Sequence, residues 1–103
     1  MLFRSLQRST LLPGVVTVSE SGLPGFEAEQ IYALLAPAGT SRDIVRRLNE
    51  EAVRAMQTTE TKSRLLADGS EVKTSTPQEL EKTIVAEIAK WTKVIKAAGI
   101  KGE

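Results

Sequence analysis

The chain has 103 residues, a length that allows one small domain with a modest hydrophobic core. Its 14 basic and 13 acidic residues are interspersed and leave a net charge of +1, so there is no electrostatic reason to expect a nucleic-acid partner. The sequence contains no cysteine or histidine and no apolar run near the ~20 residues that span a bilayer, so we expect no metal, no cofactor and no membrane insertion.

Residues 1–16 form a poorly defined, extended lead-in to the rest of the chain. Pro13 and Gly14 predict a turn within it, because proline disfavours a helical residue before it and glycine permits a positive φ. Arg4 and Arg8 are not accompanied by an apolar stretch of ~7–15 residues, so this segment predicts no secretory signal. A chain translated as written is therefore expected in the cytoplasm.

A turn and an apolar run follow. Thr17 is placed to cap a short helical turn, with Glu20 three residues later in the capping-box position. Residues 29–36 contain an apolar run without alternation, which is typical of a strand covered on both faces and predicts a crossover strand. A buried helix segment is the alternative for this run. Because a buried strand needs a sheet and the remaining sequence predicts little of one, we expect the chain to be part of a larger fold.

Two helices are predicted next, at about 41–57 and 59–68. Thr40 is placed to cap the first, and Asp43 stands in its first turn, where the helix dipole favours a carboxylate. Gly69 is placed to end the second helix. The first helix has an apolar stripe that includes Ile44, Leu48, Ala52 and Met56, and two ion pairs at i,i+4 spacing, Asp43–Arg47 and Glu50–Arg54.

The last predicted helix spans about 77–98, after a possible edge strand at 71–74. Thr76 is its predicted N-cap, Pro77 takes the first helical position and Glu79 closes a capping box. Trp91 lies on the apolar stripe of this helix, where a core position is favoured over a pocket position. The stripe consists of Leu80, Ile84, Ile88, Trp91, Ile95 and Ala98.

Catalytic patterns are absent from the sequence. Ser19 and Ser21 lie near Glu20 but have no histidine or lysine base in a nucleophile elbow. The carboxylates of Glu20, Glu27 and Glu29 form an acidic cluster, and an exposed cluster gives no reason for the separated pKa values that acid–base catalysis needs. The sequence therefore predicts that the protein is not an enzyme.

A family resemblance is carried by the ordered succession of several short segments. They are TVSESGLPGFEAEQIYALLAPAGTSRDIVRRLNEEAVRAM, KSRL, the Gly69 turn, STPQEL and EIAKWTKVIKAAGI. From Arg8 onward the chain resembles the C-terminal third of the substrate-binding receptors of tripartite tricarboxylate transporters. This resemblance implies an α/β fragment of a two-lobed periplasmic-binding-protein-like fold, mostly helical with one or two short strands, in which residues 17–103 form a portion of one lobe.

The resemblance also implies function. Receptors of this family are periplasmic and pass small carboxylates to the membrane subunits of a transporter. Phe26 and Tyr32 flank the predicted crossover strand and are the candidates for the edge of the ligand cleft. Most ligand loops of the family precede the segment that this chain resembles, so we expect the chain not to bind ligand alone and to self-associate through its exposed apolar surface. The alternative is a small helical interaction module that docks a partner through its apolar helix faces.

Overall fold

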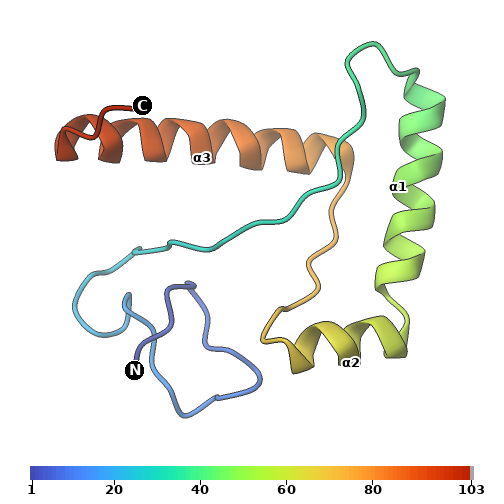
Figure 1. Ribbon diagram of the computed structural model, residues 1–103. Helices are drawn as coiled ribbons and strands as arrows, with labels where there is room; N and C mark the ends of the chain where they lie inside the picture. The colour runs from blue at the N-terminus through green and yellow to red at the C-terminus, as the bar shows by residue number, and fades with distance from the viewer. Residues whose placement is uncertain (103) are drawn as a thin grey trace. The chain divides into compact units, whose positions relative to one another are not determined.

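The chain divides into two compact units, Met1–Ala36 and Pro37–Glu103, and the computed structural model describes residues 1–102. The sequence-based division after residue 16 differs from this boundary, because main-chain hydrogen bonds join residues 3 and 4 to residues 16, 18 and 28. The first unit is irregular throughout, whereas the second holds the helices α1, α2 and α3 (Figure 1).

An isolated parallel β-bridge between Phe3 and Thr17 organises the first unit. The Phe3 amide donates to the Val16 carbonyl at 3.1 Å, and the Val18 amide donates to the Phe3 carbonyl at 2.8 Å. A third bond joins the Ala28 amide to the Arg4 carbonyl at 2.9 Å. Residues 1–16 are therefore more than a lead-in, because they supply the framework on which residues 16–28 are held.

The predicted crossover strand at 29–36 is wrong for this structure. These residues have no regular secondary structure, and the large apolar side chains of Ile31, Leu34 and Leu35 are exposed. The predicted edge strand at 71–74 is likewise irregular. A strand is stabilised by hydrogen bonds to a neighbour, and the described residues contain no strand beside which either segment could pair.

Helix α1 spans Arg42–Met56, one residue shorter at each end than its prediction. Its N-cap is Ser41 instead of the predicted Thr40, and the Ser41 hydroxyl accepts from the Ile44 amide at 3.4 Å. The Thr40 hydroxyl instead donates to the Pro37 carbonyl at 2.8 Å, which closes the turn before the helix. Both residues can cap a helix, so the local pattern alone could not separate them.

The ion pairs of α1 follow a register different from the predicted one. Arg46 lies 3.5 Å from both Asp43 and Glu50, and Glu51 pairs with Arg47 at 3.2 Å and with Arg54 at 2.9 Å. The side chains of Glu50 and Glu51 are half-exposed and those of their partners are largely exposed, so each pair contributes little to stability.

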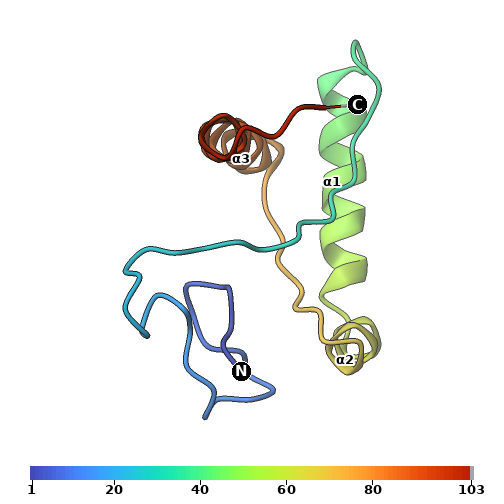
Figure 2. The ribbon, with the colours of Figure 1, turned by 60° about the vertical axis from the view of Figure 1, so that its left-hand side comes forward.

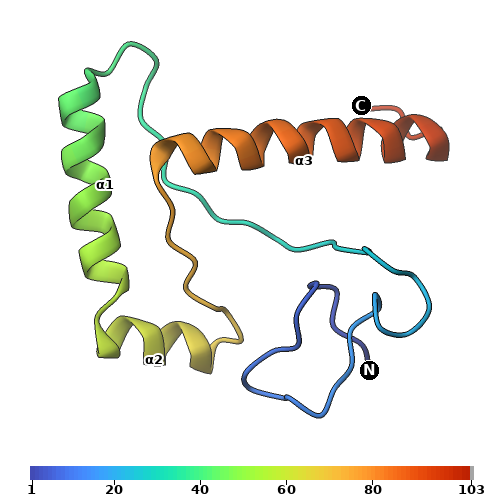
Figure 3. The same ribbon diagram turned by 180° about the vertical axis from the view of Figure 1, so that it is seen from behind.

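Helix α2 spans Thr59–Ala67 and meets α1 at a bend near Gln57 (Figures 1 and 3). Thr58 caps it, and Gly69 follows with a φ of 77°, the left-handed conformation that was predicted to end this helix. The chain then returns beside α1 as an irregular segment that includes residues 74 and 75. Two side-chain amides hold this segment, one from Asn49 in α1 and one from the C-cap residue Gln57. The Asn49 amide donates to the Ser75 carbonyl at 2.9 Å, and that of Gln57 donates to the Thr74 hydroxyl at 3.1 Å.

Helix α3 spans Pro77–Ala98, as predicted, and is seen nearly end-on in Figure 2. The predicted capping box is confirmed: the Glu79 amide donates to the Thr76 hydroxyl at 3.2 Å, and the Thr76 amide donates to the Glu79 carboxylate at 2.8 Å. Gly99 ends the helix with a φ of 65°, and the Ile100 amide donates to the Ile95 carbonyl at 3.1 Å.

The described residues contain no fully buried hydrophobic side chain. Trp91, expected in the core, is 38% exposed, and its indole N–H donates to the Glu87 carboxylate at 2.8 Å. The predicted stripe of α3 does exist as a helical face, but Ile88, Trp91 and Ile95 on it are open to solvent. Among residues 1–102, no helix combines the length and the apolar character needed to cross a bilayer.

Candidate functional site

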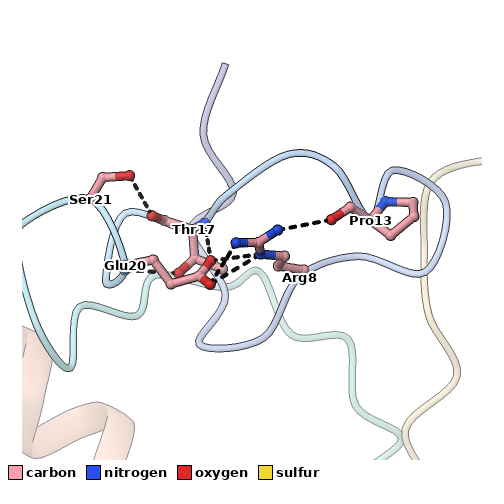
Figure 4. A network of polar contacts seen from close by, with 5 residues as sticks. All are labelled: Arg8, Pro13, Thr17, Glu20 and Ser21. Carbon is pink, nitrogen blue, oxygen red and sulfur yellow. Dashed lines mark hydrogen bonds and ion pairs between the residues drawn. The ribbon is translucent and has the colours of Figure 1, made fainter.

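The turn from Thr17 to Phe26 is the most highly organised part of the first unit. Thr17 is completely buried, and it forms a reciprocal capping box with Glu20: the Thr17 amide donates to the Glu20 carboxylate at 2.8 Å, and the Glu20 amide donates to the Thr17 hydroxyl at 3.1 Å. The Ser21 hydroxyl donates to the Thr17 carbonyl at 2.8 Å (Figure 4). The Ser21 amide also donates to the Thr17 carbonyl at 3.1 Å, so the capping box and the single helical turn predicted from the sequence are both confirmed.

A continuous series of hydrogen bonds extends this turn to Phe26. The Leu23 amide donates to the Val18 carbonyl at 3.4 Å, the Gly25 amide donates to the Ser19 hydroxyl at 2.8 Å, and the Phe26 amide donates to the Leu23 carbonyl at 3.0 Å. Gly25 has a φ of 78°, which a side chain would strain. The hydroxyls of Ser19 and Ser21 thus bond to the backbone of the turn.

The guanidinium of Arg8 contacts this turn at Glu20 (Figure 4). Its Nε lies 3.0 Å from both carboxylate oxygens of Glu20, its Nη2 lies 2.9 Å from Oε1, and its Nη1 donates to the Pro13 carbonyl at 3.2 Å. No pattern in the sequence predicted this contact. Arg8 and Glu20 are twelve residues apart in an irregular segment, so no helical or strand periodicity could have paired them.

The Arg8 guanidinium and the Thr17 amide together stabilise the ionised form of Glu20. The hydrogen bond from Arg8 is the largest cause, and that from the Thr17 amide comes next; they lower the pKa of Glu20 to about 2. The same contact raises the pKa of Arg8. Glu20 is therefore a charged, hydrogen-bonded structural group and a poor candidate for proton transfer near neutral pH.

Phe26 and Tyr32, the two candidate cleft residues, both present their rings to solvent. Phe26 is 38% exposed and is held by the turn described above, whereas Tyr32 is 83% exposed and lies in the irregular segment at 29–36. The Gln30 side-chain amide donates to the Tyr32 hydroxyl at 2.9 Å.

A shallow cleft lies in the second unit between α1 and the irregular segment before α3. Its lining residues are Asn49, Glu50, Val53, Arg54, Thr74, Ser75, Thr76 and Glu79. Several of the polar groups in it already bond to one another, which leaves no evident set of convergent donors for a ligand. In residues 1–102, no group of three or more acidic side chains is arranged to hold a metal ion.

Comparison with known proteins identifies the family. The family model described as "Tripartite tricarboxylate transporter family receptor" matches residues 3–100. The protein BugT of Bordetella pertussis is 34% identical over 97 residues, which are 94% of this chain and 30% of BugT. A UPF0065 protein from the tcbD–tcbE intergenic region of Pseudomonas sp. strain P51 is 36% identical over 92 residues, which are 88% of this chain and 27% of that protein.

A solved structure agrees with this result. The R. palustris protein Rpa4515, solved with adipate, superposes with a TM-score of 0.76 at 32% identity, over 93% of this chain and 32% of that one. The chain therefore spans less than a third of the length of BugT and of the strain P51 protein. The family is one of periplasmic transporter receptors and not of enzymes. This chain belongs to the tripartite tricarboxylate transporter receptor family.

Proposed function

We propose that this chain is a C-terminal portion of a periplasmic solute receptor and forms one flank of a cleft for small carboxylates. The observation that carries the proposal is the family match, which extends over residues 3–100. The R. palustris relative was solved with adipate, a dicarboxylate, which supports the same ligand class here. The match also favours a receptor over a separate helical interaction module, because it includes both the irregular first unit and the helices.

The isolated chain should not bind ligand, because it supplies only one flank of the cleft. Small ligands are normally held in concave sites that remove most of their surface from water. The candidate residues Phe26 and Tyr32 are exposed, and the apolar face of α3 includes the exposed side chains of Ile88, Trp91 and Ile95. In a complete two-lobed receptor the other two-thirds of the protein would cover these surfaces; without that cover, the chain should self-associate.

Phe26 and Tyr32 would lie at the edge of the completed cleft. An aromatic ring there could exclude water from the methylene groups of a dicarboxylate, and the Tyr32 hydroxyl could donate to a carboxylate oxygen. The carboxylate groups of the ligand would be held mainly by backbone N–H groups from the preceding part of the receptor. The loaded receptor would then pass its solute to the membrane subunits of a tripartite transporter.

Reconstitution from two pieces tests the proposal. This chain is mixed with the preceding two-thirds of a related receptor, and adipate, succinate and citrate are titrated into the mixture and into each piece separately, with calorimetry as the readout. Binding in the mixture alone is the expected result. Micromolar binding by this chain alone, or no binding by a mixture whose pieces demonstrably associate, would overturn the proposal.

Matched variants test the two aromatic residues. Tyr32→Phe removes only the hydroxyl, Tyr32→Ala removes the ring as well, and Leu34→Ala removes a comparably exposed apolar side chain from the same segment. We expect the two Tyr32 variants to weaken binding in the mixture in increasing order, and Leu34→Ala to leave it unchanged. Equal effects from all three would mean that the segment acts as a whole and that Tyr32 has no contact with the ligand.

A further inference from the structure

The arginine at position 8 has two possible roles in a carboxylate receptor. An arginine fork matches a carboxylate in geometry and charge, so an arginine near the candidate cleft residues could bind the ligand directly. Alternatively, it could position the residues that do. The contacts of Arg8 distinguish these roles, because they show which acceptors its N–H groups already use.

The guanidinium is already engaged by the protein. Its Nε and Nη2 contact both carboxylate oxygens of Glu20 at 2.9–3.0 Å, and its Nη1 donates to the Pro13 carbonyl (Figure 4). A ligand carboxylate at Arg8 would have to displace Glu20 and would meet a second negative charge beside it. Direct binding of an anion is therefore disfavoured on electrostatic grounds.

Glu20 connects Arg8 to the turn that holds Phe26. The carboxylate that Arg8 contacts also accepts from the Thr17 amide, and Thr17 is fully buried in the bridge to Phe3. From Val18 and Ser19 onward, two further hydrogen bonds extend to Leu23 and Gly25, and Phe26 is bonded to Leu23. The contacts thus run without a break from the guanidinium to the backbone of Phe26.

We propose that Arg8 is a positioning residue, which fixes the Thr17–Phe26 turn through Glu20 and so sets the place of Phe26 at the ligand cleft, without touching the ligand. This inference rests on the proposed receptor function. Four variants test it: Arg8→Ala, Glu20→Gln, the double variant, and Arg8→Lys, which keeps the charge but loses the fork. Arg4→Ala is the matched control, because it removes the same charge from the same unit outside this network.

The first readout is the affinity of the reconstituted receptor for adipate. Positioning predicts that Arg8→Ala and Glu20→Gln each weaken binding by about threefold to fivefold, the scale of one exposed ion pair, and that the double variant is no worse than either. Arg8→Lys should restore part of the loss, and Arg4→Ala should have no effect. If Arg8 bound the ligand directly, Glu20→Gln would release it and strengthen binding, whereas Arg8→Ala would nearly abolish it; that pattern overturns the inference.

The second readout needs no ligand and uses the 103-residue chain itself. The sequence has two phenylalanines, and both lie in the first unit, so fluorophenylalanine labelling gives one ¹⁹F resonance for the bridge residue Phe3 and one for Phe26. Arg8→Ala and Glu20→Gln should move the Phe26 resonance toward that of the free amino acid, while Arg4→Ala should not. An unmoved Phe26 resonance overturns the inference even if the receptor binds adipate. A mixture whose pieces demonstrably associate but that binds no carboxylate, while the Phe26 resonance moves, would refute the receptor proposal and retain the positioning role within the chain.

Discussion

Replacing Thr76 with alanine should weaken the start of α3 by a calculable amount. The capping box contains two hydrogen bonds, and only the bond from the Glu79 amide to the Thr76 hydroxyl depends on the threonine side chain. The second bond, from the Thr76 amide to the Glu79 carboxylate, uses a backbone donor that alanine keeps. We therefore expect a cost of about 1 kcal/mol, in the middle of the range for the loss of a cap. This corresponds to a roughly fivefold increase in the opening of the first helical turn.

Amide hydrogen exchange of residues 79–81 measures this opening directly. It is preferable to global unfolding, because the described residues have no fully buried apolar core on which cooperative unfolding would depend. Thr76→Ser keeps the hydroxyl and should exchange like the parent, whereas Thr92→Ala, in the helix interior, should slightly increase protection because alanine favours the helix. Equal exchange in Thr76→Ala and Thr76→Ser would refute the assigned role of the cap.

The exposure of Trp91, the ionisation of Glu20 and the backbone angle of Gly99 can each be tested by one measurement. Trp91, the one tryptophan, is 38% exposed in a single chain, so Trp91→Ala should cost well below the ~3–5 kcal/mol of a fully buried ring, and a cost in that full range for the dilute, unassociated chain would contradict the observed exposure. Its emission maximum in dilute solution should lie between those of buried and solvent-exposed indoles, and it should shift to the blue as self-association at higher concentration covers the apolar face of α3. Because the pKa of Glu20 is lowered from 4.5 to about 2, its stabilising effect on the turn should be complete above pH 4.5 and should be lost as the pH falls toward 2; unchanged protection of the Thr17 amide below about pH 2 would count against it. Gly99→Ala places a side chain at a φ of 65° and should cost about 1 kcal/mol at the end of α3, seen as faster exchange of the Ile100 amide, while Gly102→Ala serves as the control with no such φ.

Helix ends were the part of the fold that the sequence predicted best. Caps depend on a few neighbouring residues, so the boxes at Thr17–Glu20 and Thr76–Glu79 and the left-handed glycine at 69 could be identified without knowledge of the rest of the protein. The cap of α1 was misplaced by one residue, because Thr40 and Ser41 have equivalent side chains for this purpose.

The irregular backbone at 29–36 and the exposure of Trp91 could not be predicted, for a common physical reason. Each depends on groups distant in sequence: a strand needs a partner with free backbone groups, and a buried ring needs apolar neighbours on all sides. An apolar pattern reports that a surface is suited to burial, and it does not report what covers it. The Arg8–Glu20 contact escaped prediction because it joins two irregular segments, where sequence spacing gives no information about proximity.

A chimera tests whether this chain forms one flank of a carboxylate receptor. In the R. palustris protein solved with adipate, the 32% of the chain that superposes on this one is replaced by residues of the present sequence, and adipate is titrated into the purified product by calorimetry. We expect the folded chimera to bind adipate, and we expect Arg8→Ala within the substituted part to weaken this binding by a few fold. A chimera that folds like its parent, shown by circular dichroism and thermal unfolding, but binds no carboxylate would contradict the claim.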